Sequence, residues 1–138
     1  MTATVEVTEA PLSPDLHAKA VAGPGSGATV VFSGVVRDHD HGRSVVELEY
    51  VAHPSAADVL QAVADEVAAD PAVHAVSVSH RVGTLVVGDI ALVAAVAAAH
   101  RGEAFAAAER LVDLVKDRLP VWKRQRFTDG SDEWVNCP

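Results

Sequence analysis

Cysteine and aromatic residues are scarce in this chain of 138 residues, and the scarcity excludes several kinds of structure. Cys137 is the single cysteine, so neither an intramolecular disulfide nor a zinc site of paired cysteines can form. Aromatic residues make up 4% of the chain, and alanine and valine supply most of the apolar side chains. We therefore expect a core of small and β-branched side chains. The lack of disulfides fits a reducing compartment and predicts a cytoplasmic location.

Long hydrophobic runs are missing as well. The longest, residues 90–99, is too short to cross a bilayer. The N-terminal segment lacks the basic-then-apolar order of a signal peptide. We predict one domain over residues 1–138, without membrane association.

The net charge of −8 argues against nucleic-acid binding, but the charges are unevenly distributed. Seven basic and four acidic residues lie between positions 100 and 127, so this segment carries +3 and the remainder −11. A basic segment in an acidic protein predicts a local site for an anion. The alternative is a solvated helix face with ion pairs between neighbouring turns.

Hydrophobic periodicity predicts a mixed series of strands and helices. Strands are expected at 2–8, 28–36, 45–52, 73–82, 90–99, 121–127 and, briefly, 134–135. Helices are expected from Pro14, at 54–69 and at 102–119, with Phe105 on the apolar face of the last. We expect 45–52 to be a hairpin partner, and 37–44 and 83–88 to be loop and turn. Without strict βαβ alternation, the fold class is α+β, two-layered, with a mixed, mainly antiparallel sheet.

The junction His100-Arg101-Gly102 is the first candidate site, because a buried strand there leads into a helix. Free backbone N–H groups at a helix start bind anions, and the planar guanidinium of Arg101 suits phosphate or carboxylate. The alternative is a surface ion pair between Arg101 and Glu103.

Two of the three lysines form the second candidate. Lys116 borders the apolar face of its helix, where partial loss of hydration lowers a lysine pKa toward a range useful for proton transfer. Lys123 lies in an alternating strand, on the side opposite Trp122 and Arg124. The alternative is that both lysines extend to solvent.

The segment RDHDHG, residues 37–42, holds two histidines and two aspartates but matches no structural zinc pattern. We predict no metal and no cofactor, and assign Arg37 to an anion. His74 and His80 are expected to be ordinary core or surface histidines. No phosphate-binding loop of the Walker type is present.

Five motifs occur in one order and spacing: FSGVVRDHDHG, HRVGTLVVGD, AAHRGEAF, LVKDRLPVWKRQRF and DEWV. Together they resemble the large, catalytic subunit of molybdopterin synthase over residues 28–136, with residues 1–27 weakly covered. The resemblance implies an α/β hammerhead-like fold and a central homodimer within a heterotetramer. It also implies a small ubiquitin-like sulfur carrier, whose C-terminal Gly-Gly tail ends in a thiocarboxylate and transfers sulfur to cyclic pyranopterin monophosphate. The product is the dithiolene of molybdopterin.

By motif position, the resemblance assigns the substrate contacts, with the two lysines as the catalytic pair: Arg37, His100, Arg101, Lys116, Lys123 and Arg124. Two positions depart from the family, which often has a basic residue at Val35 and an acid at Gln125. A non-enzymatic module that binds an anionic metabolite is the alternative function.

Helix length adds a constraint to these assignments. Fifteen residues separate Arg101 from Lys116, which at the helical rise puts their backbones about 22 Å apart. One chain could hardly close both side chains on one small ligand. A site shared across a two-fold dimer would bring Arg101 of one subunit to Lys116 of the other.

Overall fold

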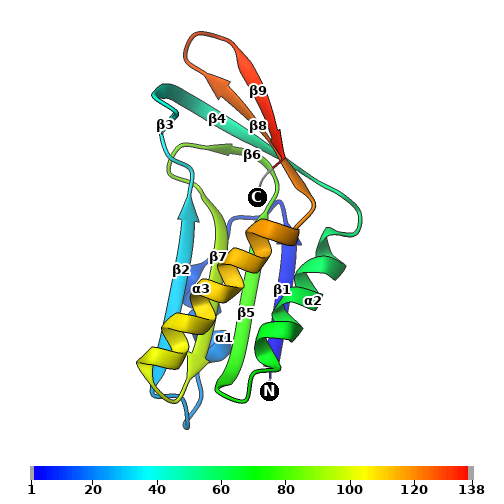
Figure 1. The fold of residues 1–138 in the computed structure, drawn as a ribbon. Coiled ribbons are helices and arrows are strands. Elements are labelled where there is room, and N and C mark those ends of the chain that lie inside the picture. The colour runs from blue at the N-terminus through cyan, green and yellow to red at the C-terminus, as the bar shows by residue number, and fades with distance from the viewer. Residues whose placement is uncertain (1, 137–138) are drawn as a thin grey trace.

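Two β-sheets and three helices make up the described part of the chain, residues 2–136, in a computed structural model (Figure 1). The elements in chain order are β1 (Thr2–Thr8), α1 (Pro14–Val21), β2 (Ala28–Val35), β3 (His39–Asp40), β4 (Arg43–Ala52), α2 (Ala56–Ala68), β5 (Val73–Arg81), β6 (Gly83–Val86), β7 (Ile90–Ala98), α3 (Arg101–Arg118), β8 (Val121–Phe127) and β9 (Asp132–Asn136).

The first sheet has the strand order β1-β5-β7-β2, with β2 at one edge. β1 and β5 are parallel, whereas β5 with β7 and β7 with β2 are antiparallel. Helices α2 and α3 pack on one face and α1 on the other (Figure 1). Alanine and valine fill this core as their abundance predicts, and β7 is buried from Ala91 to Ala98.

The second sheet stands beyond the end of the first and has the order β3-β4-β8-β9, with β6 also paired to β4 (Figure 1). Its inner face joins the main core through Leu48, Tyr50 and Phe127. Leu119 is the C-cap of α3, Pro120 follows it, and β8 begins at the next residue. Because proline cannot continue a helix, the chain changes direction there after only two connecting residues.

The predicted α+β class with mainly antiparallel pairing is confirmed, but four local predictions are wrong. Segment 37–44 is not a loop throughout, because it contains β3 and the first residues of β4. Segment 45–52 is no hairpin partner of 28–36: β2 pairs with β7, and the chain crosses to the second sheet after Val36. Segment 83–88 contains β6, which pairs with β4. Phe105 is 61% exposed, because α3 is only partly covered by β2.

No helix within residues 2–136 has the length and apolar character that crossing a membrane requires.

Candidate active site

A pocket of about 370 Å³ opens between the two sheets, beside the C-terminal end of α3. Its walls come from the end of β2, the β3 hairpin, β4, β5, β7, α3 and β8. It is lined by Gly34, Val35, Val36, Arg37, His39, Asp40, Leu48, Tyr50, His80, Ala91, Leu92, Lys116, Lys123 and Gln125.

Three of the predicted site residues, Arg37, Lys116 and Lys123, line this one pocket. Lys116 lies in the last turn of α3 and Lys123 near the start of β8, on either side of Pro120. Arg37 follows β2 and crosses toward the second sheet. The pocket therefore presents two ammonium groups and a guanidinium, which together suit an anion.

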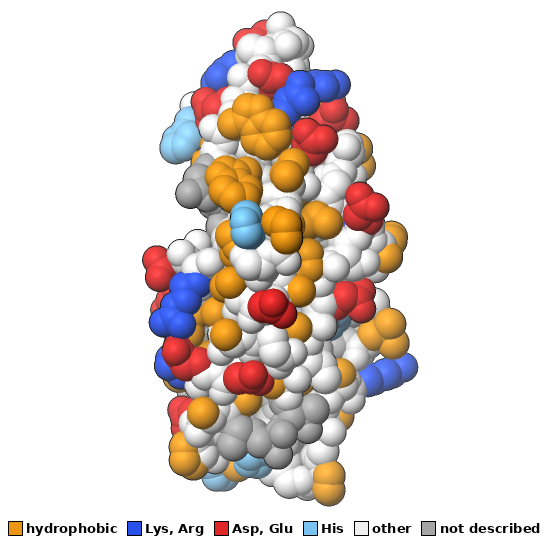
Figure 2. Space-filling model, turned by 90° about the vertical axis from the view of Figure 1, so that its right-hand side faces the viewer, with side chains coloured by type: hydrophobic (Ala, Val, Ile, Leu, Met, Phe, Trp, Pro, Cys, Tyr) orange, Lys and Arg blue, Asp and Glu red, His pale blue; other side chains and the backbone are white. Residues whose placement is uncertain are grey.

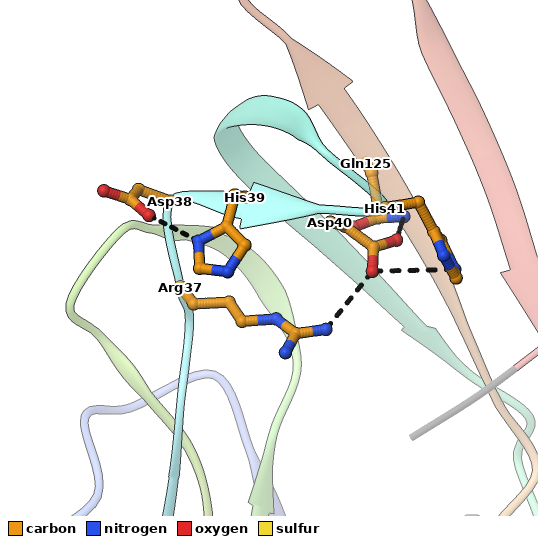
Figure 3. A network of polar contacts seen from close by, with 6 residues as sticks. All are labelled: Arg37, Asp38, His39, Asp40, His41 and Gln125. Carbon is orange, nitrogen blue, oxygen red and sulfur yellow. Dashed lines mark hydrogen bonds and ion pairs between the residues drawn. The ribbon is translucent and has the colours of Figure 1, made fainter.

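Arg37 and Asp40 form an ion pair at the rim of the pocket (Figure 3). Arg37 Nη2 donates to Asp40 Oδ1 over 3.2 Å, and Gln125 Nε2 donates to Asp40 Oδ2 over 2.8 Å. The Gln125 hydrogen bond lowers the pKa of Asp40, and the nearby charges of His41, Lys123 and Arg37 lower it further against the opposing effect of burial. Asp40 is therefore ionised at neutral pH.

His80 lies at the floor of the pocket and is 1% exposed. Its Nδ1 is 2.7 Å from the carbonyl oxygen of Arg81, so Nδ1 carries the proton and Nε2 is an acceptor. The ring stands edge-on to Tyr50, with centroids 5.0 Å apart. Burial lowers the pKa of His80 to about 4, and the charge of Lys116 contributes to that shift.

The buried imidazole predicts an acid-sensitive fold. An unfolded chain binds a proton at His80 near pH 6.5, whereas the folded chain does so only near pH 4. Between these values the unfolded state holds more protons, so the unfolding free energy falls as the pH falls. We expect this residue to remove about 3 kcal/mol between pH 7 and pH 4.

Urea unfolding of wild type and His80→Phe at both pH values measures this effect. The variant should lose less stability on acidification than wild type. His74→Phe, on the same strand but hydrogen-bonded to Ser26, is the matched control. Equal losses in wild type and His80→Phe would contradict the assignment.

Arg124 does not line the pocket, although the resemblance places it at the substrate. Side chains alternate along β8, so Lys123 and Gln125 face inward while Arg124 lies on the outer face of the second sheet. Its guanidinium pairs with Asp132 at 2.6 Å and with Glu49 at 3.6 Å. The structure thus separates Arg124 from the two lysines within one chain.

His100 and Arg101 are exposed at the N-terminal end of α3 and do not line the pocket. His100 is the N-cap residue, and its side chain makes no capping hydrogen bond. Helix α3 is continuous from Arg101 to Arg118, so the helical rise separates Arg101 from Lys116 as the residue spacing predicts. Arg101 and Lys116 of one chain therefore lie at opposite ends of α3 and do not meet in one pocket.

Sequence reasoning assigned five polar residues of the pocket to no role in the site: His39, Asp40, Tyr50, His80 and Gln125. A signal existed for His80, because it continues the inward positions Val76 and Val78 on β5. Within residues 2–136 no three His, Cys, Asp or Glu side chains are grouped to hold a metal ion.

The architecture matches solved structures over almost its full length. The crystal structure of molybdopterin synthase from Staphylococcus aureus is 31% identical, with a TM-score of 0.86 and 94% coverage of both chains. The molybdopterin biosynthesis MoaE protein of Burkholderia ambifaria MC40-6 is also 31% identical, with a TM-score of 0.81 and coverage of 97% of this chain and 89% of that one. The fold is thus that of the molybdopterin synthase class.

Sequence relatives identify the family. Residues 7–118 match the MoaE protein family. The molybdopterin synthase catalytic subunit of Nostoc sp. PCC 7120 is 43% identical over 133 residues, covering 94% of this chain and 80% of the relative. The catalytic subunit 1 of Mycobacterium tuberculosis H37Rv is 39% identical over 130 residues, covering 94% and 88%. The chain belongs to the family of molybdopterin synthase catalytic subunits, enzymes of molybdopterin biosynthesis.

Proposed function

We propose that this chain is the sulfurtransferase subunit that converts cyclic pyranopterin monophosphate into molybdopterin. Sulfur comes from the thiocarboxylated Gly-Gly tail of a small ubiquitin-like carrier. The observation that carries the proposal is the pocket in which Arg37, Lys116 and Lys123 meet. A guanidinium binds a cyclic phosphate well, and lysines beside apolar walls can move protons.

Each transfer forms a carbon–sulfur bond and breaks a carbon–oxygen bond on the pterin substrate, and the departing oxygen gains a proton as it leaves. Water then cleaves the bond between sulfur and the carrier's acyl carbon, so that the carrier departs with a carboxylate. We assign the proton transfers of these steps to Lys116 and Lys123, which line the pocket. Sulfur arrives on the carrier, so this chain needs no reactive cysteine of its own. Cys137, its single cysteine, lies outside the described residues. A cytoplasmic location fits a chain with a single cysteine, because disulfides are rare in reducing compartments.

An apolar groove next to the pocket suits the carrier. It has a volume of about 480 Å³, and its apolar lining consists of Val30, Val31, Phe32, Phe105, Ala108 and Val112. β2 is a sheet edge that passes from the groove, at Phe32, to the pocket, at Gly34 and Val35. A carrier seated in the groove could therefore send an extended tail along β2 to the lysines. A structure of the same fold from Helicobacter pylori, 19% identical with a TM-score of 0.72, is a protein–protein complex of subunits 1 and 2 of molybdopterin-converting factor.

We expect Phe105→Asp to weaken carrier binding by at least about tenfold, because a charge replaces a large apolar side chain that lines the groove. Exposure of the side chain limits the effect on folding. Calorimetric titration with the carrier measures the affinity. Leu16→Asp, at a side chain 66% exposed on α1, is the control and should bind normally. Equal affinities of the two variants would exclude the groove as the docking surface.

A homodimer completes the proposed site by bringing His100 and Arg101 of a second copy to the pocket. The outer face of the second sheet supports such a contact, since it exposes Val51, Trp122 and Trp134. Figure 2 shows hydrophobic side chains gathered over the upper part of the molecule, where this sheet lies. Exposed apolar patches of this kind mark interaction surfaces.

Reconstitution with the thiocarboxylated carrier and cyclic pyranopterin monophosphate tests the proposed reaction. Formation of the dithiolene product is the expected result. Binding of the phosphate without any sulfur transfer would instead favour the alternative, a module that binds an anionic metabolite.

A further inference from the structure

A single carboxylate faces the cations of the pocket. Among the described lining residues, Arg37, Lys116 and Lys123 carry positive charge and Asp40 is the one acidic side chain. A carboxylate weakens the attraction of this pocket for an anion. Its presence therefore calls for a role other than binding the anion directly.

The backbone turn after Asp40 and two hydrogen bonds hold both of its carboxylate oxygens in place. Asp40 ends the two-residue strand β3, and the turn behind it has positive φ at His41 and Gly42, at 50° and 78°. Oδ2 accepts from the buried amide of Gln125, which is 2% exposed. Oδ1 is thereby turned toward Arg37, as Figure 3 shows. The Gln125 amide thus holds the carboxylate in place, and the carboxylate contacts Arg37.

The contact with Asp40 orients the Arg37 guanidinium and leaves its other N–H donors available for a ligand. Its side chain is 68% exposed, and one of its N–H groups holds Asp40. A guanidinium has five donors in a planar fork, so a phosphate can bind the remaining ones. An exposed arginine without such a partner would sample many rotamers and lose that freedom on binding.

We propose that Asp40 and Gln125 form a positioning pair, in which the buried amide holds the carboxylate and the carboxylate orients Arg37 toward the substrate phosphate. This inference rests on the proposed function. Asp40 also offsets the repulsion between Arg37 and Lys123 while the pocket is empty, because both charges act on its carboxyl group.

The pairing explains why an amide rather than an acid suits position 125, where Gln125 donates to Asp40. A carboxylate at 125 beside the one at Asp40 would place two like charges within hydrogen-bond distance, and one of them would take up a proton. One carboxylate and one amide are compatible, and the two groups are nearly the same shape. Exchanging them between the two positions therefore retains both the hydrogen bond and the net charge.

The exchange is the test. We expect Asp40→Asn to lower kcat/KM for the cyclic phosphate about tenfold in the reconstituted complex, since the pair of side chains at positions 40 and 125 loses the negative charge that attracts Arg37. Gln125→Glu alone should also reduce it. The double variant D40N/Q125E should regain most of the loss, because the exchange returns the negative charge to the pair and keeps its hydrogen bond. The mobility of the Arg37 side chain separates orientation of this guanidinium from a merely structural bond between positions 40 and 125.

Asp38→Asn is the matched control, because Asp38 lies two residues away and pairs with His39 rather than with Arg37. It should keep wild-type kcat/KM. Full activity of Asp40→Asn, or a double variant as slow as Asp40→Asn, would overturn the inference. Inactivity of the wild-type complex would instead refute the proposed function.

Relaxation of the Arg37 side-chain Nε–H, measured by NMR on the free chain, then decides the inference independently of turnover. The Arg37 side chain should become more mobile in Asp40→Asn and stay unchanged in Asp38→Asn. Unchanged mobility in both variants would overturn the positioning role.

Discussion

Lys116→Ala should abolish sulfur transfer in the reconstituted complex, with turnover reduced at least about a hundredfold, the usual contribution of a general acid or base. Lys116 is exposed in the last turn of α3 and lines the pocket with Lys123. Its loss removes a favourable charge at a helix C-terminus, so the cost in unfolding free energy should be about 1 kcal/mol or less. Product formation and urea unfolding measure the two effects separately.

Two further variants test whether proton transfer, rather than the positive charge alone, explains the loss of turnover. Lys116→Arg keeps the charge but holds its proton at all accessible pH values, so it should bind the cyclic phosphate and still turn over poorly. Lys19→Ala removes an exposed lysine in the last turn of α1 and should leave activity unchanged. Wild-type rates of sulfur transfer in Lys116→Ala would contradict the assignment of Lys116 as a catalytic residue.

The pattern of β8 shows how far local sequence reasoning extends. Alternation along the strand predicts that Lys123 and Arg124 lie on opposite faces, and the structure confirms it: one lines the pocket, and the other pairs with Asp132. The period of a strand is a local property, set by the backbone. The partner of a side chain depends on which strands become neighbours, which alternation cannot predict.

Long-range pairing accounts for what sequence reasoning missed. The segment after Val36 could have turned back onto β2, and its alternating pattern fits either sheet. The second sheet instead forms because β4 pairs with β8, more than 70 positions further along the chain. That pairing places Gln125 beside Asp40, 85 positions apart. No rule of sequence spacing connects residues so far apart, so the contact between Asp40 and Gln125 could not be predicted from the sequence.

The structure leaves Arg101 and Lys116 at opposite ends of α3, and this separation predicts complementation between inactive subunits. Arg101→Ala and Lys116→Ala should each be inactive alone. After subunit exchange, a mixed dimer with shared sites has one site that carries both lesions and one that carries none. Random mixing makes about half of the dimers mixed, so about a quarter of all sites should regain activity.

Mixing Lys116→Ala with Lys123→Ala is the control for this complementation, because both lysines line the pocket of the same chain. In that mixture each site lacks one lysine, and no activity should return. Native mass spectrometry of isotope-labelled subunits verifies that exchange has occurred. If every site were built from one chain, the first mixture would also stay inactive, since each pocket would carry one lesion. An inactive first mixture, with exchange demonstrated, therefore rules out a site shared across the dimer and requires His100 and Arg101 to act elsewhere.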